Sequence, residues 1–163
     1  MGILILGVTI CPICCDIITN RDSYFSFPAF VVNLKDPLYF FNDTSFHERC
    51  LKKVELTSKA KEVSYLYIKN IRPENRKCLI RGNLITDYHR HIFIERLASG
   101  KYDFLYQFNY KHIDKNNLPF WNIKEQFLKA LDLLVASKNW KEIDDKKYLK
   151  RLIFETSSTP NSP

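Results

Sequence analysis

Apolar and aromatic residues occur in short runs along the first third of the chain, and turn residues separate the runs. The run Ile3–Ile10 is largely apolar but far too short to span a bilayer, so it predicts a buried first strand. Cys15–Thr19 predicts a second strand, and the aromatic segments Phe25–Asn33 and Leu38–Phe41 predict two more. We therefore expect a strand-rich N-terminal region.

The middle of the chain changes to a helical pattern and then returns to strands. Leu51–Ile71 predicts a helix with a break near Thr57–Ser58, which ends before Arg72 because a proline follows. After it, alternation predicts three further strands: Lys77–Asp87, Tyr88–Ile94 and Tyr102–Tyr110.

Two helices are expected at the C-terminal end. Asn122 can cap the first, with Glu125 three residues on. Its apolar face is formed by Ile123, Phe127, Ala130, Leu131 and Leu134. The second, Asp144–Phe154, carries the basic residues Lys146, Lys147, Lys150 and Arg151. Its apolar positions favour docking on protein over lying on a membrane: Tyr148, Leu149, Leu152 and Ile153.

The composition is that of a folded domain or two small ones. The chain has 163 residues, of which 45% are hydrophobic and 14% aromatic, which is enough to fill a core. Residues 156–163 contain only Ser, Thr, Pro and Asn, so we expect a flexible tail. No basic segment precedes the apolar run as a signal peptide requires, so we expect a cytoplasmic protein without a membrane partner.

The five cysteines indicate a metal site rather than a disulfide framework, because the number is odd and two of them are adjacent. Cys11-Pro12-Ile13-Cys14 is a Cys-x-x-Cys turn, whose thiolates can bind one tetrahedral ion. A redox dithiol is an alternative, but such a pair usually starts a helix, and here a strand is expected to follow.

A second pair of ligands follows at His47-x-x-Cys50. Ser45 and Glu48 have the spacing of a capping box, which places His47 and Cys50 on one face of the first helical turn. The resulting Cys3His set is a structural zinc composition that leaves no coordination position for a substrate. The alternative is a group of buried free thiols with a surface histidine.

These residues resemble the treble-clef zinc fingers, in which a Cys-x-x-Cys knuckle opens a hairpin and a following helix supplies the second ligand pair. The resemblance covers about residues 8–56 and implies one structural Zn²⁺ bound by Cys11, Cys14, His47 and Cys50. One position departs from the pattern: Cys15 stands where such knuckles often have glycine. Cys15 is therefore either strained or a competing ligand.

The sequence also repeats itself at an offset of 67 residues. Ten of 41 aligned positions are identical, and they cluster at the knuckle and before the helix. The identical residues are Cys11, Ile13, Ile18, Thr19, Asp36, Leu38, Tyr39, Phe41, Asn42 and Leu51, which match Cys78, Ile80, Ile85, Thr86, Asp103, Leu105, Tyr106, Phe108, Asn109 and Leu118.

The second copy lacks the metal ligands of the first. Arg81, Asp114 and Asn117 replace Cys14, His47 and Cys50, although Gly82 supplies the turn residue. Packing must then stabilise it, with Cys78 and His112 left as ligands of at most a weaker site. The expected fold is α+β: two treble-clef-like ββα units in tandem, the first zinc-bound and the second metal-free, followed by C-terminal helices. The domains are residues 1–71 and 72–155, with the tail 156–163.

Positive charge is concentrated after residue 50. Residues 1–50 carry three basic and five acidic side chains, whereas residues 51–163 carry 22 and 13. The densest stretch lies within residues 52–90, so a nucleic acid or an acidic protein is a reasonable partner, and an ordinary solvated surface is the alternative. Phosphate contacts would come from Lys52, Lys53, Lys59, Lys61, Arg72, Arg76, Lys77 and Arg81.

No catalytic set stands out in the sequence. The Cys and His residues are assigned to metal, and we interpret His89 and His91 as a solvated strand face. Some nucleases use a treble-clef scaffold with a histidine on the hairpin, but residues 16–41 contain none. We therefore expect a non-enzymatic adaptor that binds a protein partner and no small-molecule substrate. A nucleic-acid-binding zinc finger is the alternative, and a degenerate metal-dependent nuclease ranks last.

Overall fold

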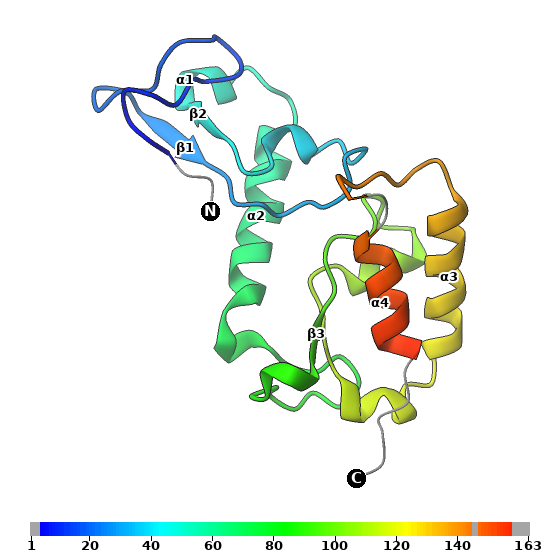
Figure 1. The fold of residues 1–163 in the computed structure, drawn as a ribbon. Coiled ribbons are helices and arrows are strands. Elements are labelled where there is room, and N and C mark those ends of the chain that lie inside the picture. The colour runs from blue at the N-terminus through cyan, green and yellow to red at the C-terminus, as the bar shows by residue number, and fades with distance from the viewer. Residues whose placement is uncertain (1–3, 145–146, 158–163) are drawn as a thin grey trace. The chain divides into compact units, whose positions relative to one another are not determined.

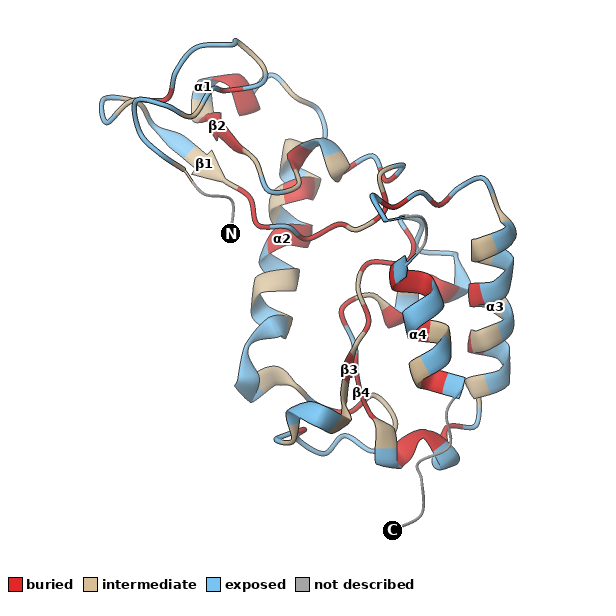
Figure 2. Ribbon diagram, in the orientation of Figure 1, coloured by how far each residue is buried: buried red, intermediate tan, exposed pale blue. Residues whose placement is uncertain are grey.

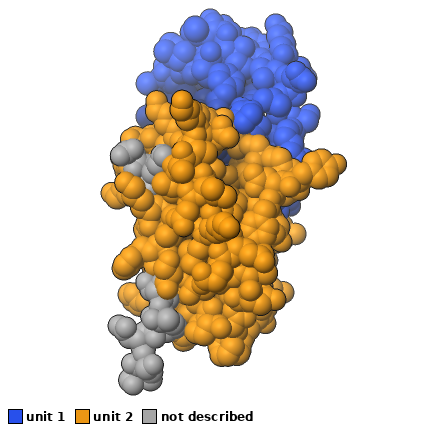
Figure 3. Space-filling model, turned by 90° about the vertical axis from the view of Figure 1, so that its right-hand side faces the viewer, with its two compact units in different colours: residues 1–31, 37–68 blue, residues 32–36, 69–163 orange. Residues whose placement is uncertain are grey.

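The computed structural model describes residues 4–144 and 147–157. The chain divides into two compact units, coloured separately in Figure 3. Unit 1 comprises residues 1–31 and 37–68, and unit 2 comprises residues 32–36 and 69–163. Each contains one small antiparallel hairpin and helices, which agrees with the expected α+β class (Figure 1). In the described residues, no helix has both the length and the hydropathy needed to cross a membrane.

The hairpin of unit 1 is formed by β1 (Tyr24–Ser26) and β2 (Ser45–His47), with the 3-10 helix η1 (Tyr39–Phe41) between them. Phe25 pairs with Phe46 in its register. Around it, the rings of Phe27, Phe30, Phe41 and Phe46 are fully buried and pack with centroids 5.2 to 6.0 Å apart. These aromatic contacts form a core despite the short strands.

Two helices follow the hairpin, α1 (Glu48–Leu51) and α2 (Thr57–Ile71). The helix is interrupted as predicted, but the interruption covers residues 52–56, and Thr57 and Ser58, where the break was expected, begin α2. The predicted capping box at Ser45 is wrong, because Ser45 lies in β2 and its hydroxyl bonds that of Ser26 at 2.7 Å. The strand continues to His47, so the helix begins only after it.

Unit 2 contains the second hairpin, β3 (His91–Phe93) with β4 (His112–Asp114), preceded by the 3-10 helices η2 (Pro73–Asn75) and η3 (Tyr88–Arg90). The 3-10 helix η4 (Phe104–Phe108) lies between the strands, and η5 (Lys115–Phe120) follows them. Helices α3 (Lys124–Ala136) and α4 (Lys147–Ser157) complete the unit. Its core is formed by buried side chains from both helices and both strands, and the ribbon of Figure 2 is red at buried residues.

The C-terminal helices agree with the predicted apolar faces. Phe127 and Leu131 are fully buried on α3, and Leu149 and Leu152 on α4. The start of α3 differs, since Ile123 rather than Asn122 occupies the N-cap and makes no side-chain cap. The other end of the chain also differs, because α4 includes Thr156 and Ser157; the rest of the expected tail, like Lys146, lies outside the described residues.

Glu142 substitutes for a conventional cap at α4. Its buried carboxylate accepts hydrogen bonds from the backbone amides of Tyr148 at 2.7 Å and Leu149 at 3.3 Å. The indole N–H of Trp140 donates to the same carboxylate. A negative charge at a helix N-terminus interacts favourably with the helix dipole, so this contact stabilises the docked helix.

The predicted buried first strand is wrong. Within residues 4–10 the chain turns at Gly7, which adopts φ +82°, and only Ile10 forms a strand-like bridge, to Ile17. Ile5 and Val8 are more than half exposed. An apolar run is buried only if another element covers it. The short segment around Ile17, with which residues 4–10 pair, covers only part of this run.

The other predicted strands are shorter than expected or replaced by 3-10 turns. Residues 38–41 and 102–110 contain η1 and η4, and the segment 77–87 contains isolated bridges, one between Lys77 and Leu84 and one from Cys78 to His112. Beyond β1, Pro28 has no amide hydrogen, and the Oδ1 of Asn42 accepts from the amides of Phe30 and Val31 at 2.6 and 2.8 Å, so the strand does not extend through residues 28–31. Those amides are thereby unavailable to a strand ladder.

Equivalent positions 67 residues apart make the same contacts in the two units. Tyr24 pairs with His47, as His91 pairs with Asp114. Asn109 accepts from the amides of residues 97 and 98, as Asn42 does from residues 30 and 31. The register and the loop hydrogen bonds of the hairpins thus follow the sequence repeat.

Candidate metal centre

The first two thiols of the centre lie on a tight turn. The amide of Cys11 donates to the Asp16 carbonyl, and the amide of Cys15 donates back to the Cys11 carbonyl, both at 2.9 Å. The turn requires Cys15 to adopt φ +62°, in the left-handed region where a Cβ is unfavourable. Cys15 is exposed and is not part of the cluster, so it is a strained turn residue rather than a competing ligand.

The other two ligands come from the junction of β2 and α1. His47 is the last residue of β2, and Cys50 lies in the short helix that follows. The four ligand atoms of Cys11, Cys14, His47 and Cys50 lie within 4.8 Å of one another. The structure therefore brings together the four residues predicted from sequence into a cluster that can hold a metal ion such as zinc.

The cluster is shielded from solvent on most sides. Cys11 is fully buried, His47 is 1% exposed and Cys50 is 5% exposed, while Cys14 is partly buried. A buried set of three sulfur donors and one imidazole matches a tetrahedral structural zinc site, in which no position remains for water or substrate. When bound, the ion would hold the turn, β2 and α1 together.

The two ring nitrogens of His47 face different groups. Its Nδ1 lies 3.3 Å from the sulfur of Cys14, and its Nε2 lies 3.6 Å from a carboxylate oxygen of Asp22. Nε2 is buried without a hydrogen-bond partner. Nδ1 is therefore the nitrogen that faces the metal position, and Nε2 faces a carboxylate outside it.

Sequence reasoning missed Asp22. Its carboxylate accepts hydrogen bonds from the amide and hydroxyl of Thr19 at 2.9 and 2.7 Å. These bonds, together with the charges nearby, lower the pKa of Asp22, so it is ionised at neutral pH. Its spacing from Thr19 indicates a local turn, but nothing in the sequence brings it to His47, which is 25 residues away.

The thiols of the knuckle differ in acidity. Burial raises the pKa of Cys11, but hydrogen bonds from the backbone of Cys14 and from His47 outweigh it and lower the pKa to about 6. The Asp16 backbone lowers the pKa of Cys14, but desolvation and the neighbouring thiols Cys50 and Cys11 raise it to about 11. Crowded thiolates repel one another, and a divalent cation removes that repulsion.

In unit 2, the thiol equivalent to Cys11 is that of Cys78, and it accepts hydrogen bonds where unit 1 has further metal ligands. The side-chain amide of Asn117 donates to the sulfur of Cys78 at 3.2 Å, and the amide of Asp114 donates to it at 3.4 Å. Burial raises the pKa of Cys78, but these bonds outweigh it and lower the pKa. Among the described residues, the four-residue cluster of unit 1 is the one group that meets the metal geometry.

The imidazole of His112 is also engaged elsewhere. Its Nε2 lies 2.9 Å from the Asn70 carbonyl oxygen, and its Nδ1 lies 2.7 Å from Nε2 of His91. Our interpretation of His89 and His91 as one solvated strand face is therefore wrong. His89 lies in η3, and His91 is partly buried against His112 in the hairpin.

The eight basic residues predicted to contact phosphates belong to both units. In unit 1, Lys52 and Lys53 are exposed, Lys59 pairs with Glu62 at 2.9 Å, and Lys61 lies over the ring of Phe25. In unit 2, Arg72 and Lys77 are exposed, Arg76 is partly buried, and Arg81 lies over the ring of Phe120 at 3.6 Å. The pairings of Lys59, Lys61 and Arg81 reduce their freedom to bind phosphate.

An exposed apolar surface lies next to the metal centre. Its five aliphatic side chains come from the two arms that flank the Cys-x-x-Cys turn, and each is 43% to 65% exposed: Ile5, Leu6, Val8, Ile10 and Ile17. Figure 2 shows the same region as mostly exposed. We call it the knuckle surface.

Protein-family models, curated proteins and solved structures were compared with the chain, and none of them matches it. Its function is therefore inferred from the side chains of the metal centre and from the surfaces around it.

Proposed function

We propose that this protein is a non-catalytic binding module in which one structural Zn²⁺ organises a treble-clef-like unit for contact with a protein partner. The knuckle surface is the observation that carries the proposal. Five exposed aliphatic side chains on the two short arms beside one turn are unfavourable in water, and such patches mark interaction sites in soluble proteins. They flank Cys11 and Cys14, so a metal ion would hold them in place.

The donor set supports a structural role for the ion. Three sulfur atoms and one imidazole complete a tetrahedron, so no open position remains where a metal could activate water. The tight turn supplies Cys11 and Cys14, and the junction of β2 and α1 supplies His47 and Cys50, which is the treble-clef order. The equivalent contacts of unit 2 support a tandem arrangement whose second member is metal-free.

A nucleic-acid-binding role is the second candidate. Lys52, Lys53 and Lys61 line a hollow formed by α1, α2 and the turn between them. Glu48 and Glu55 line the same hollow and offset part of the positive charge. The protein-binding role is favoured because acidic residues accompany these lysines, whereas the five exposed side chains that define the knuckle surface are all aliphatic, with Asp16 paired to Arg49 beside them.

Affinity purification from the host, at low and high salt, tests the proposal with matched variants. Val8→Asp and Ile17→Asp place a charge on the knuckle surface, and Ile143→Asp does the same at an 82% exposed position of unit 2. We expect one stoichiometric protein partner that persists at high salt, is lost with both knuckle variants and is retained with Ile143→Asp.

Two results would contradict the proposal. In one, the knuckle variants retain the partner as the parent protein does. In the other, the parent protein retains only nucleic acid, which high salt releases because phosphate contacts depend on counterion release. The metal content of every variant is measured in parallel, so that loss of the ion is distinguished from loss of the surface.

A further inference from the structure

A hollow of about 440 Å³ in unit 2 combines histidines with basic side chains. The lining residues that could bind a ligand are Arg76, Tyr88, His91, His112, Lys115 and Arg151. They come from the segment after η2, from η3, from both strands of the hairpin, from η5 and from α4. We call it the histidine hollow. It shares no residue with the metal centre.

Hydrogen bonds determine the protonation of the two imidazoles in this hollow. The Asn70 carbonyl can only accept, so Nε2 of His112 carries a hydrogen and its Nδ1 is an acceptor. Nε2 of His91, 2.7 Å away, must then donate to it. In the neutral pair, Nδ1 of His91 is therefore left with a lone pair, and no described residue bonds it.

The surroundings keep both rings neutral. Burial lowers the pKa of His112 to about 4, and burial together with the charge of Arg76 lowers the pKa of His91. The unprotonated nitrogen of His91 is thus a hydrogen-bond acceptor, oriented by His112 and through it by the backbone. The ring centroids of the two histidines lie 5.0 Å apart and the ring planes differ by 29°, so the rings meet edge to edge through this hydrogen bond, which orients His91.

The basic side chains of the hollow have few acidic partners. Among the described residues, neither Arg76 nor Arg151 forms a salt bridge, and Lys115 lies 3.9 Å from Glu155. Burial raises the pKa of Glu95, the other acidic residue of the lining, to about 7, so its charge is reduced at neutral pH. Arg151 also lies over the ring of Tyr148, 5.8 Å from its centroid. Guanidinium groups without a carboxylate partner are a common means of binding phosphate.

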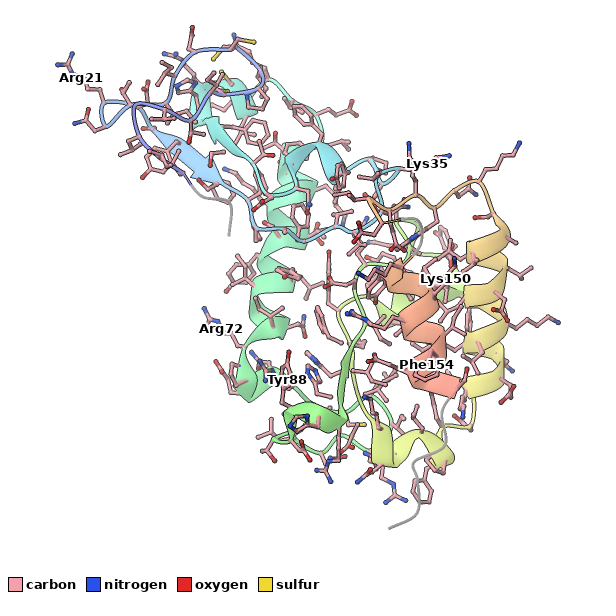
Figure 4. All side chains as sticks on the ribbon, viewed as in Figure 1. Arg21, Lys35, Arg72, Tyr88, Lys150 and Phe154 are labelled. Carbon is pink, nitrogen blue, oxygen red and sulfur yellow. The ribbon has the colours of Figure 1, made fainter. Side chains whose placement is uncertain are left out.

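We propose that the histidine hollow binds a small phosphorylated ligand bearing a hydroxyl group, such as a sugar phosphate or a nucleotide. Arg76, Lys115 and Arg151 bind the phosphoryl group, and Nδ1 of His91 accepts a hydrogen bond from the hydroxyl. Tyr88, which is 76% exposed beside His91, offers a ring against which a base or sugar can pack. Figure 4 shows Tyr88 on the turn that precedes β3.

Binding to the full chain is measured by calorimetry with ribose 5-phosphate, ribose, inorganic phosphate and a short single-stranded RNA. We expect ribose 5-phosphate to bind best, inorganic phosphate to bind more weakly and ribose alone not to bind. Arg76→Gln and Arg151→Gln should each weaken ribose 5-phosphate binding about tenfold. Arg72→Gln, an exposed arginine of unit 2 outside the hollow, is the control and should change nothing.

The histidine is tested separately, because its loss could disturb the hairpin. His91→Phe keeps an aromatic ring and should weaken ribose 5-phosphate while leaving inorganic phosphate unchanged. If this variant does not fold, the arginine variants still decide the question, since Arg151 is exposed on α4. The proposal is overturned if ribose 5-phosphate does not bind, if Arg72→Gln weakens it equally, or if only the RNA binds.

Discussion

Cys15 and Gly82 lie 67 residues apart and adopt the same left-handed backbone conformation, with φ +62° and +73°. Each follows a four-residue turn whose first residue, Cys11 or Cys78, accepts a hydrogen bond from its amide at 2.9 or 2.8 Å. The same turn is thus built with glycine in unit 2 and with a cysteine in unit 1. Only the cysteine is strained there, because it carries a Cβ.

Replacing the strained residue should stabilise the knuckle. Cys15→Gly removes the Cβ from the left-handed conformation, and we expect the free energy of unfolding to increase by about 0.5 kcal/mol, because the strain relieved exceeds the stability lost through glycine's greater flexibility in the unfolded chain. Gly82→Ala should decrease it by about 1 kcal/mol. Urea denaturation measures both changes. Loss of metal from Cys15→Gly would show that Cys15 is a ligand.

Removing a ligand should affect unit 1 far more than removing the equivalent thiol of unit 2. Cys50→Ala should release the metal and unfold unit 1, because binding energy is folding energy in small zinc modules. Cys78→Ala should retain the metal and cost about 1–2 kcal/mol of stability through lost packing. Elemental analysis and circular dichroism measure the two effects. Equal metal loss from both variants would mean that the assignment of Cys50 as a ligand and of Cys78 as a packing residue is wrong.

Metal affinity should increase with pH. The pKa of Cys14 is about 11, so at neutral pH this thiol must release a proton when it binds the ion. Protons therefore compete with the metal, and affinity should decrease about tenfold per pH unit for each proton displaced. Below pH 6, the pKa of Cys11, the thiol of Cys11 is protonated as well and the slope should steepen. Competition with a chelator across this range measures it, and a flat profile would contradict the thiolate ligands.

Asp22 should strengthen the metal site without touching the ion. Its carboxylate lies 3.6 Å from Nε2 of His47, on the side of the ring away from the thiols. Asp22→Asn removes the charge that favours a hydrogen on Nε2, so the metal affinity should fall about tenfold. Asp43→Asn, at an exposed left-handed position that asparagine tolerates, is the control. Equal affinities of the two variants would show that Asp22 does not position the ring.

The sequence predicted the metal ligands and the long helices but not the strands. Ligand spacing is a local property: Cys11 and Cys14 share one turn, and His47 and Cys50 share one helix start. The helical periods are likewise local, which is why α2, α3 and α4 lie near their predicted ranges. Strands require partners, and side chains such as Asn42 remove backbone amides from pairing.

The sequence alone determined which atoms can bind a metal and which helices form, because both depend on neighbours within a few positions. It also determined where the chain repeats, because the repeat is read from identical residues at a constant offset. Tertiary structure decided that Asp22 faces His47 and that His91 bonds His112. It also left the apolar segment around Val8 exposed. These outcomes depend on which distant segments pair and in which register, and that depends on the packing free energy of each unit as a whole.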